Sequence, residues 1–190
     1  MMTIRVALAG AVAAIIAAVI YLQAPRLAPP SPSMTLEQVE NTVEALYKTP
    51  QITPEELARR SGDRVLLFDV REKAEYDESH IAGAIHTPPD MSAETFAALH
   101  GPALKGATVV FYCSVGVRSS QMMNRVRAAL EAGGATAAHN LRGGVFRWAA
   151  EARPLVSDKG PTATAHPFNE AWGALLQRTL EARDKHDRGV

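Results

Sequence analysis

Apolar residues along the chain follow two different periods. Short runs rich in β-branched residues, most clearly 65–70 and 108–112, predict buried strands of a parallel sheet. A stretch with apolar residues every three or four positions, at 117–131, predicts an amphipathic helix. Strands and helices alternate, which predicts an α/β fold with a parallel β-sheet flanked by helices on both faces. Shorter segments predict strands at Ile52, 84–85 and 137–141, and helices that begin at Pro54 and at Ser92, the latter ending at Leu99.

A longer apolar run, 6–22, precedes these elements. It holds 17 uncharged residues, whereas a membrane-spanning helix needs about 20, with a lower limit near 17. A cleaved signal peptide has a shorter apolar region of roughly 7–15 residues and then an Ala-x-Ala-like site. Here Leu22 replaces the first small residue of that site, and Pro25 would follow the scissile bond. We therefore favour an uncleaved signal anchor, which would form an N-terminal transmembrane helix, over a cleaved signal peptide.

This anchor predicts where the rest of the chain lies. Arg5 precedes the run and Arg26 follows it, so the bias of positive charge is modest. We expect a single-pass membrane protein with its N-terminus in the cytoplasm. The remainder would then lie outside the cytoplasm, in the periplasm if the source is a Gram-negative bacterium.

The organisation expected beyond the anchor is one domain with an extension at each end. Four prolines predict a stiff linker, and Thr35 with Gln38 predicts a capped helix start. Residues after 156 predict a helix packed back on the domain, although a partner-binding role is an alternative, and Arg183–Val190 is expected to fray. The predicted divisions are the anchor at 1–24, the linker at 25–34, an amphipathic helix at 35–50, the main domain at 51–155 and a helical extension at 156–190.

Composition removes some classes of function. Twenty basic and twenty acidic residues cancel, so no nucleic-acid partner is expected. The six histidines are scattered and match no metal-ligand spacing, so no metal site is expected either. Cys113 is the only cysteine of the 190 residues. It therefore cannot form an intramolecular disulfide within this sequence or belong to a cluster of thiolate ligands.

Cys113 stands at a position that favours a reactive thiol. The apolar run 108–112 ends at the cysteine, a small-residue loop with one glycine follows, and the helical pattern begins at Val117. The first N–H groups of a helix have no partner inside the helix and lie at the positive end of its dipole. A thiol beside them ionises more easily, and Arg118 adds a positive charge. The alternative is a small buried apolar residue at a strand end.

Several motifs together resemble the rhodanese (sulfurtransferase) family over residues 51–155. Four residues separate Cys113 from Arg118, as in the family's Cys-x4-Arg loop, whereas related phosphatases and arsenate reductases use a longer Cys-x5-Arg loop. Ser79 departs from the family pattern, which has glycine before the histidine. The other matching motifs are Asp69-Val70-Arg71-Glu72, Glu75-Tyr76, His80-Ile81-Ala82-Gly83-Ala84 and Leu141-Arg142-Gly143-Gly144 with Trp148.

The resemblance implies a mechanism without a cofactor. The Cys113 thiolate would take the outer sulfur of a small sulfur-donor anion and hold it as a persulfide. Backbone N–H groups of Ser114, Val115, Gly116, Val117 and Arg118 would stabilise the persulfide charge, and Arg118 would orient the donor. The acceptor would be an external thiol or cyanide, since the sequence holds no second cysteine.

Asp69 and Arg71 have two interpretations. They could act as electrostatic partners of the cysteine loop, or as structural support in an ion pair at the strand ends. Structural ion pairs are common, so we favour structural support.

Other functions stay open beside sulfur transfer. A phosphatase or arsenate reductase is disfavoured by the loop length. A rhodanese-like module that binds a partner at the membrane without catalysis is less expected, because Cys113 and Arg118 are both present. A sulfur carrier for one dedicated partner would have the same sequence features, and an oxidation-sensing thiol is a further variant.

Overall fold

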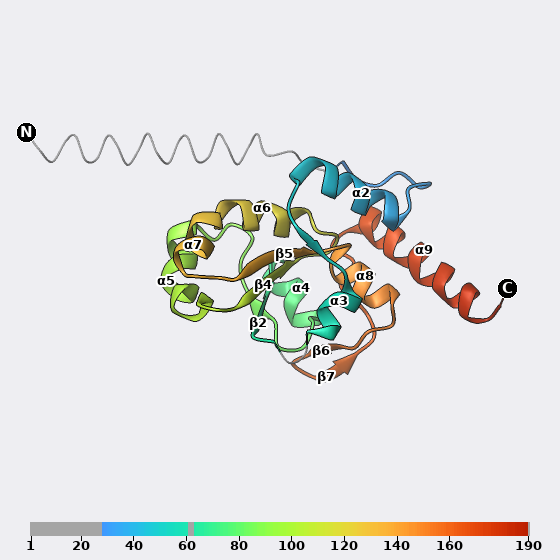
Figure 1. Cartoon of the computed structure of the whole chain (residues 1–190). Coiled ribbons are helices and arrows are strands. Elements are labelled where there is room, and N and C mark those ends of the chain that lie inside the picture. Colours follow the sequence, from blue (N-terminus) through green and yellow to red (C-terminus); the bar gives the residue numbers. More distant parts are fainter. Residues whose placement is uncertain (1–27, 61–62, 190) are drawn as a thin grey trace, which may run out of the picture.

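A five-stranded parallel sheet forms the centre of the residues that the structure, a computed structural model, describes: 28–60 and 63–189. The strand order is β1-β5-β4-β2-β3, so the strand that leads to Cys113 is the central one. All four pairings are parallel, with β4 in register between β2 and β5. Figure 1 shows this sheet between two layers of helices. The strands are β1 Gln51–Ile52, β2 Val65–Asp69, β3 Ile85–His86, β4 Thr108–Tyr112 and β5 Ala137–Leu141.

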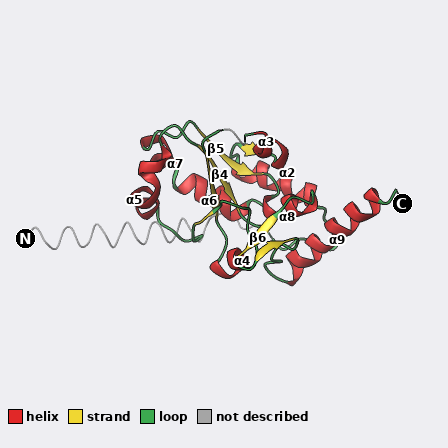
Figure 2. Cartoon of the chain, turned by 90° about the horizontal axis from the view of Figure 1, so that it is seen from below, coloured by secondary structure: helices red, strands yellow, loops and turns green. Residues whose placement is uncertain are grey.

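Alternate residues of β4 explain why helices cover both faces of the sheet. Val109 and Phe111 point into a core built with α5, α6 and α7, whereas Val110 and Tyr112 join a core built with α2, α8 and α9. The prediction of an α/β fold with helices on both faces is therefore confirmed (Figures 1 and 2). The helices are α2 Leu36–Tyr47, α3 Pro54–Arg59, α4 Lys73–Glu78, α5 Ala93–Leu104, α6 Val117–Arg125, α7 Arg127–Ala132, α8 Gly144–Ala150 and α9 Glu170–Asp187.

The helices at the two ends of the described chain pack on the same side of the sheet. Helix α2 begins with the capping box expected from Thr35 and Gln38. Most of its apolar side chains are buried, whereas Leu46 is 45% exposed. Helix α9 buries Trp172 and Leu175 and contacts both α8 and α2. It continues to Asp187, past the point where fraying was predicted, and Arg183 donates a hydrogen bond to the Ala149 carbonyl at 3.1 Å.

Two local predictions were wrong, and one element was not predicted. Helix α5 continues past Leu99 and through Pro102, because burial of Leu104 offsets the cost of the proline. The predicted helix 117–131 is divided into α6 and α7 at Val126, although its i to i−4 hydrogen bonds continue there. A β-hairpin that the sequence pattern did not indicate follows α8. Its strands are β6 Leu155–Ser157 and β7 Gly160–Thr162.

The predicted signal anchor falls on 6–22, which lies outside the residues that the structure describes. Within 28–60 and 63–189, none of the helices is long and apolar enough to cross a membrane.

Candidate active site

Cys113 lies directly after the central strand, where the chain turns into α6. Its Sγ accepts a hydrogen bond from the Gly116 backbone N–H at 3.2 Å. Gly116 has a φ of 102° and immediately precedes the first residue of α6, Val117. The thiol is therefore held at the N-terminus of a nine-residue helix, where the helix dipole favours negative charge. Only 1% of Cys113 is exposed.

The segment that begins with the Gly143-Gly144 turn is hydrogen-bonded to the cysteine loop. Val145 donates its backbone N–H to the Cys113 carbonyl at 2.9 Å, and the next backbone N–H donates to the Ser114 carbonyl at 3.1 Å. A Cβ at Gly144 would lie 2.2 Å from the Cys113 carbonyl oxygen. Only glycine permits this close approach, because it has no Cβ. Its φ of 55° is also left-handed, a conformation that glycine adopts without strain. The second glycine of the predicted motif therefore fixes the loop.

Arg118 is bound by a carboxylate that the sequence analysis did not select. Its two terminal nitrogens donate to the Glu75 carboxylate at 2.6 and 2.8 Å, and one also donates to Ser114 Oγ at 3.0 Å. Glu75 comes from α4 and is 2% exposed. It lies in the Glu75-Tyr76 motif, but nothing local in the sequence links it to Arg118, which is 43 residues away.

Charge at the site favours the thiolate. Burial opposes ionisation of Cys113, but Arg118 and hydrogen bonds from Ser119 and from the Val115 backbone outweigh it, so the pKa of the thiol is lowered. Burial also opposes ionisation of Glu75, yet its pKa is lowered by its bonds to Arg118. The pKa of Arg118 is raised in turn, despite burial, by Glu75 and Cys113. Arg118 therefore favours the negatively charged forms of both Cys113 and Glu75.

Asp69 and Arg71 form an ion pair beneath the loop. Both side chains are fully buried, and the guanidinium donates to the Asp69 carboxylate at 2.6 and 2.9 Å and to the Ser79 carbonyl. The guanidinium also lies 5.7 Å from the centre of the Tyr112 ring. These contacts tie β2 to the turn after α4 and to the strand that ends at Cys113.

The other predicted loop residues come together but are buried rather than exposed. Ser114 and Val115 are each 4% exposed, and Gly116 is buried beside the Asn140 side chain. Val117 packs against the apolar core instead of facing the thiol. Asn140 was not predicted, although it links β5 to the start of α6 by accepting a hydrogen bond from Ser119 at 2.6 Å.

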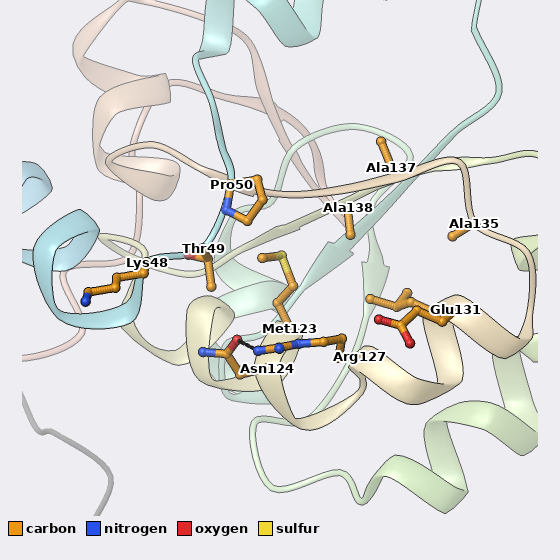
Figure 3. Close-up of a pocket in the computed structure, with 11 residues that line it drawn as sticks. Lys48, Thr49, Pro50, Met123, Asn124, Arg127, Glu131, Ala135, Ala137 and Ala138 are labelled. Carbon is orange, nitrogen blue, oxygen red and sulfur yellow. Dashed lines mark hydrogen bonds between the residues drawn. The ribbon is translucent and has the colours of Figure 1, made fainter.

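A cleft of about 360 Å³ lies elsewhere, between α7, β5 and the segment after α2. Figure 3 shows Asn124, Arg127 and Glu131 on one side of it and Pro50 and alanines of β5 on the other. Neither the cysteine nor any residue of its loop lines this cleft. In the described part of the chain, no group of three or more His, Cys, Asp and Glu side chains is placed to hold a metal ion.

Comparisons with known proteins agree with these motifs. The family model of the rhodanese-like domain matches residues 53–151. The "Sulfurtransferase" of Allochromatium vinosum is 33% identical over 112 residues, which are 58% of this chain and 97% of that protein. The "Probable adenylyltransferase/sulfurtransferase MoeZ" of Mycobacterium tuberculosis is 37% identical over 107 residues, or 54% of this chain. The match spans only 25% of that mycobacterial protein.

A solved structure also matches the described domain. The human single-domain sulfurtransferase TSTD1 is 32% identical, with a TM-score of 0.41, and the match covers 52% of this chain and 94% of the human one. The family model spans more than half of the sequence, and its segment contains both the cysteine loop and Glu75. The chain belongs to the rhodanese-like domain family.

Proposed function

We propose that the protein is a sulfurtransferase that moves sulfane sulfur from thiosulfate, or a related small anion, through a persulfide on Cys113. The observation that carries this proposal is the buried thiol with a lowered pKa beside Arg118 and the N-terminus of α6. Two relatives named as sulfurtransferases support it. The reaction needs a nucleophilic thiolate and a site that tolerates negative charge, and this arrangement supplies both.

In the first step, the Cys113 thiolate attacks the outer sulfur of thiosulfate. The new bond joins Sγ to that sulfur, the old sulfur–sulfur bond breaks, and sulfite leaves with its electron pair. The product is a persulfide anion on the cysteine. The Gly116 N–H, which now donates to Sγ at 3.2 Å, belongs to the same loop of N–H groups that would stabilise the persulfide charge.

In the second step, a thiophilic acceptor removes the sulfur. Cyanide or a thiolate attacks the terminal sulfur, giving thiocyanate or a new persulfide, and the electron pair of the broken bond returns to Sγ. The cysteine is again a thiolate, so no external oxidant or reductant is needed. The acceptor is a separate molecule or chain, since these 190 residues hold no second cysteine.

Arg118 acts in this scheme through its charge. Its terminal nitrogens are already occupied by Glu75 and Ser114, so it has few donors left for an incoming anion. Its positive charge favours the thiolate and the persulfide and offsets the charge of the donor. Glu75 holds the guanidinium in place and partly neutralises it.

The test is thiosulfate:cyanide sulfur transfer by the purified full chain, measured as thiocyanate. We expect the wild-type chain to produce thiocyanate and Cys113→Ser to produce none above background. Circular dichroism of both proteins confirms that they are folded. A folded wild-type chain that makes no thiocyanate and shows no persulfide mass on Cys113 after thiosulfate treatment would refute the proposal.

A dedicated sulfur carrier is the second candidate, and the 1% exposure of Cys113 favours it. A carrier would accept one sulfur and release it only to its partner. Mass spectrometry would then show a stable persulfide on Cys113 without continuous thiocyanate formation. A phosphatase or arsenate reductase would instead hydrolyse a phosphoester or reduce arsenate, and neither activity is expected from the four-residue loop.

We also propose that the chain is anchored in a membrane through residues 6–22, with the described domain outside the cytoplasm. The uncharged run of 17 residues is what supports this location. The test is fractionation of cells that express the full chain, followed by alkaline extraction. Recovery in the soluble fraction, or protection of the domain from protease added outside the inner membrane, would contradict it.

A further inference from the structure

Phe168 has two unusual properties beside the cysteine loop. It is one of the few large apolar residues that the structure leaves exposed, at 43%. Its φ of 66° is left-handed, a conformation that is strained for an aromatic residue. Its ring lies 4.7 Å from the guanidinium carbon of Arg118, the distance of a cation–π contact. Phe168 lies outside the family match at 53–151, in the C-terminal extension.

Arg118 interacts with both Cys113 and Phe168, so contacts link the thiol to the aromatic ring through the guanidinium. Cys113 is innermost and 1% exposed, Arg118 interacts with it and has 19% of its side chain exposed, and Phe168 covers Arg118. Two other sides of the loop are also packed. A Cβ at Gly116 would touch Asn140 and α2, and the Gly143-Gly144 turn packs against the Cys113 carbonyl.

The segment that carries Phe168 is fixed at both ends. His166 donates its backbone N–H to Ser79 Oγ at 3.2 Å, and its ring Nδ1 accepts the Phe168 N–H at 3.0 Å. Asn169 then caps α9 by accepting the Trp172 N–H at 3.2 Å. Ser79 is the position where this chain departs from the glycine of the family pattern. A glycine would have no hydroxyl to hold His166, so this departure positions the segment.

We propose that Phe168 determines the specificity of the cysteine loop by closing the approach to Cys113 over Arg118, so that small reactants reach the thiol and bulky ones do not. Ser79 is a positioning residue for this closure. The proposal rests on the proposed sulfur transfer for its physiological meaning, but the closure itself concerns access to the thiol. It places a gating residue in the extension rather than in the family domain.

The test is alkylation of Cys113, the only cysteine, in the full chain. Iodoacetamide serves as the small reagent and fluorescein-5-maleimide as the bulky one. We expect Phe168→Ala to speed the reaction with the maleimide by about tenfold and to change the iodoacetamide rate by less than about twofold, as for removal of a lid. Ser79→Gly should also raise the ratio of the maleimide rate to the iodoacetamide rate. Leu99→Ala, which truncates an apolar residue of α5 that is 62% exposed, is the matched control and should leave both rates unchanged.

The ratio of the two rates decides the outcome. An unchanged ratio in Phe168→Ala, or equal acceleration of both reagents, would overturn the proposal, because equal acceleration indicates local unfolding rather than a wider approach. Phe168→Leu supplies the answer if the alanine variant does not fold. Thiocyanate formation is measured separately. A changed ratio in Phe168→Ala, with no thiocyanate formed by the wild-type chain, would refute the proposed function but not the closure by Phe168. An unchanged ratio, with thiocyanate formed, would refute only the closure.

Discussion

Arg118 interacts with both Glu75 and Cys113. Glu75 holds the guanidinium with two short hydrogen bonds, and the same positive charge helps to lower the pKa of Cys113. Because burial alone would raise that pKa, the reactivity of the thiol depends on Arg118 and on the hydrogen bonds of the loop. Substitution of single residues can separate these contributions.

We expect Arg118→Gln to slow the alkylation of Cys113 by iodoacetamide at pH 7 by roughly tenfold, because loss of a neighbouring positive charge raises the pKa of the thiol. Rates measured from pH 5 to 10 give the midpoint of ionisation. The wild-type midpoint should lie below the usual thiol value of about 8.5. Arg59→Gln, which removes a guanidinium that is 63% exposed on α3, is the control. Equal midpoints in wild type and Arg118→Gln would contradict this account.

Gly144 allows a second prediction about a single residue. Gly144→Ala would push a Cβ against the Cys113 and Ser114 carbonyl oxygens, 2.2 and 2.7 Å away, at a left-handed φ. We expect a loss of about 3 kcal/mol in the free energy of unfolding, from clash and backbone strain together. Gly101→Ala is the matched control, since its Cβ meets nothing within 4 Å and alanine in a helix stabilises by about 0.5–1 kcal/mol. Similar urea midpoints for the two variants would be evidence against the tight turn.

Helix α2 depends on one buried carboxylate for its position. Glu40 is 1% exposed and pairs with Arg147 at 2.7 Å and with Arg142 at 3.2 Å. Both arginines belong to the segment that forms the turn beneath Cys113. A Cβ at Gly143 would lie 2.2 Å from the Glu40 carboxylate, so the helix packs directly on that turn. Val43 of the same helix lies over Gly116.

We expect Glu40→Ala to lower the free energy of unfolding by about 3–5 kcal/mol, because it leaves the two arginines without their buried partner. Glu44→Ala removes a carboxylate that is 37% exposed and pairs with Arg142, so about 1 kcal/mol or less is expected. Urea unfolding followed by tryptophan fluorescence measures both. A loss no larger for Glu40→Ala than for Glu44→Ala would mean that this carboxylate does not dock α2.

The centre of the sheet was predictable because β2 and β4 are apolar on both faces. Parallel pairing buries such runs, and β4 is buried throughout and β2 over its last three residues. The position of Cys113 after β4 and before α6 followed from the same pattern. The division of the helix at Val126 was not predictable, since the apolar period continues through it.

The partners of the candidate site were harder to predict than its centre. Glu75 joins Arg118 across 43 residues, and its neighbours in the sequence are those expected of an ordinary solvent-facing helix. Phe168 was part of the segment predicted to pack back on the domain, but no local pattern placed its ring over the arginine. Such pairings depend on how separate elements meet in space, which period and spacing do not encode.

At the scale of the whole molecule, three parts of the chain enclose Cys113. The family segment 53–151 supplies the loop and Glu75, α2 covers Gly116, and the C-terminal extension covers Arg118. Figure 1 shows α9 next to α2 and α8. The extensions therefore belong to the same packed structure as the site, and changes in overall stability should also change access to the thiol.

Two histidines far from the cysteine should make that stability depend on pH. His100 packs against Phe68 and Phe96, with ring centroids 4.9 and 5.0 Å away, and burial lowers its pKa. Burial and then the charge of Arg60 lower the pKa of His139 on β5. In both, the folded state favours the neutral ring. The unfolded chain therefore takes up protons first as the pH falls through about 6.5.

We therefore expect the free energy of unfolding to fall between pH 7 and pH 5. Histidines with a lowered pKa stabilise the fold when the pH is above their pKa in the unfolded chain, and this contribution is lost as the pH falls below that pKa. Urea midpoints measured across that range test the sign. His100→Leu should make the dependence shallower, because it removes a group that protonates more readily in the unfolded chain. A midpoint that rises toward pH 5, or the same slope in wild type and His100→Leu, would show that other groups control the pH response.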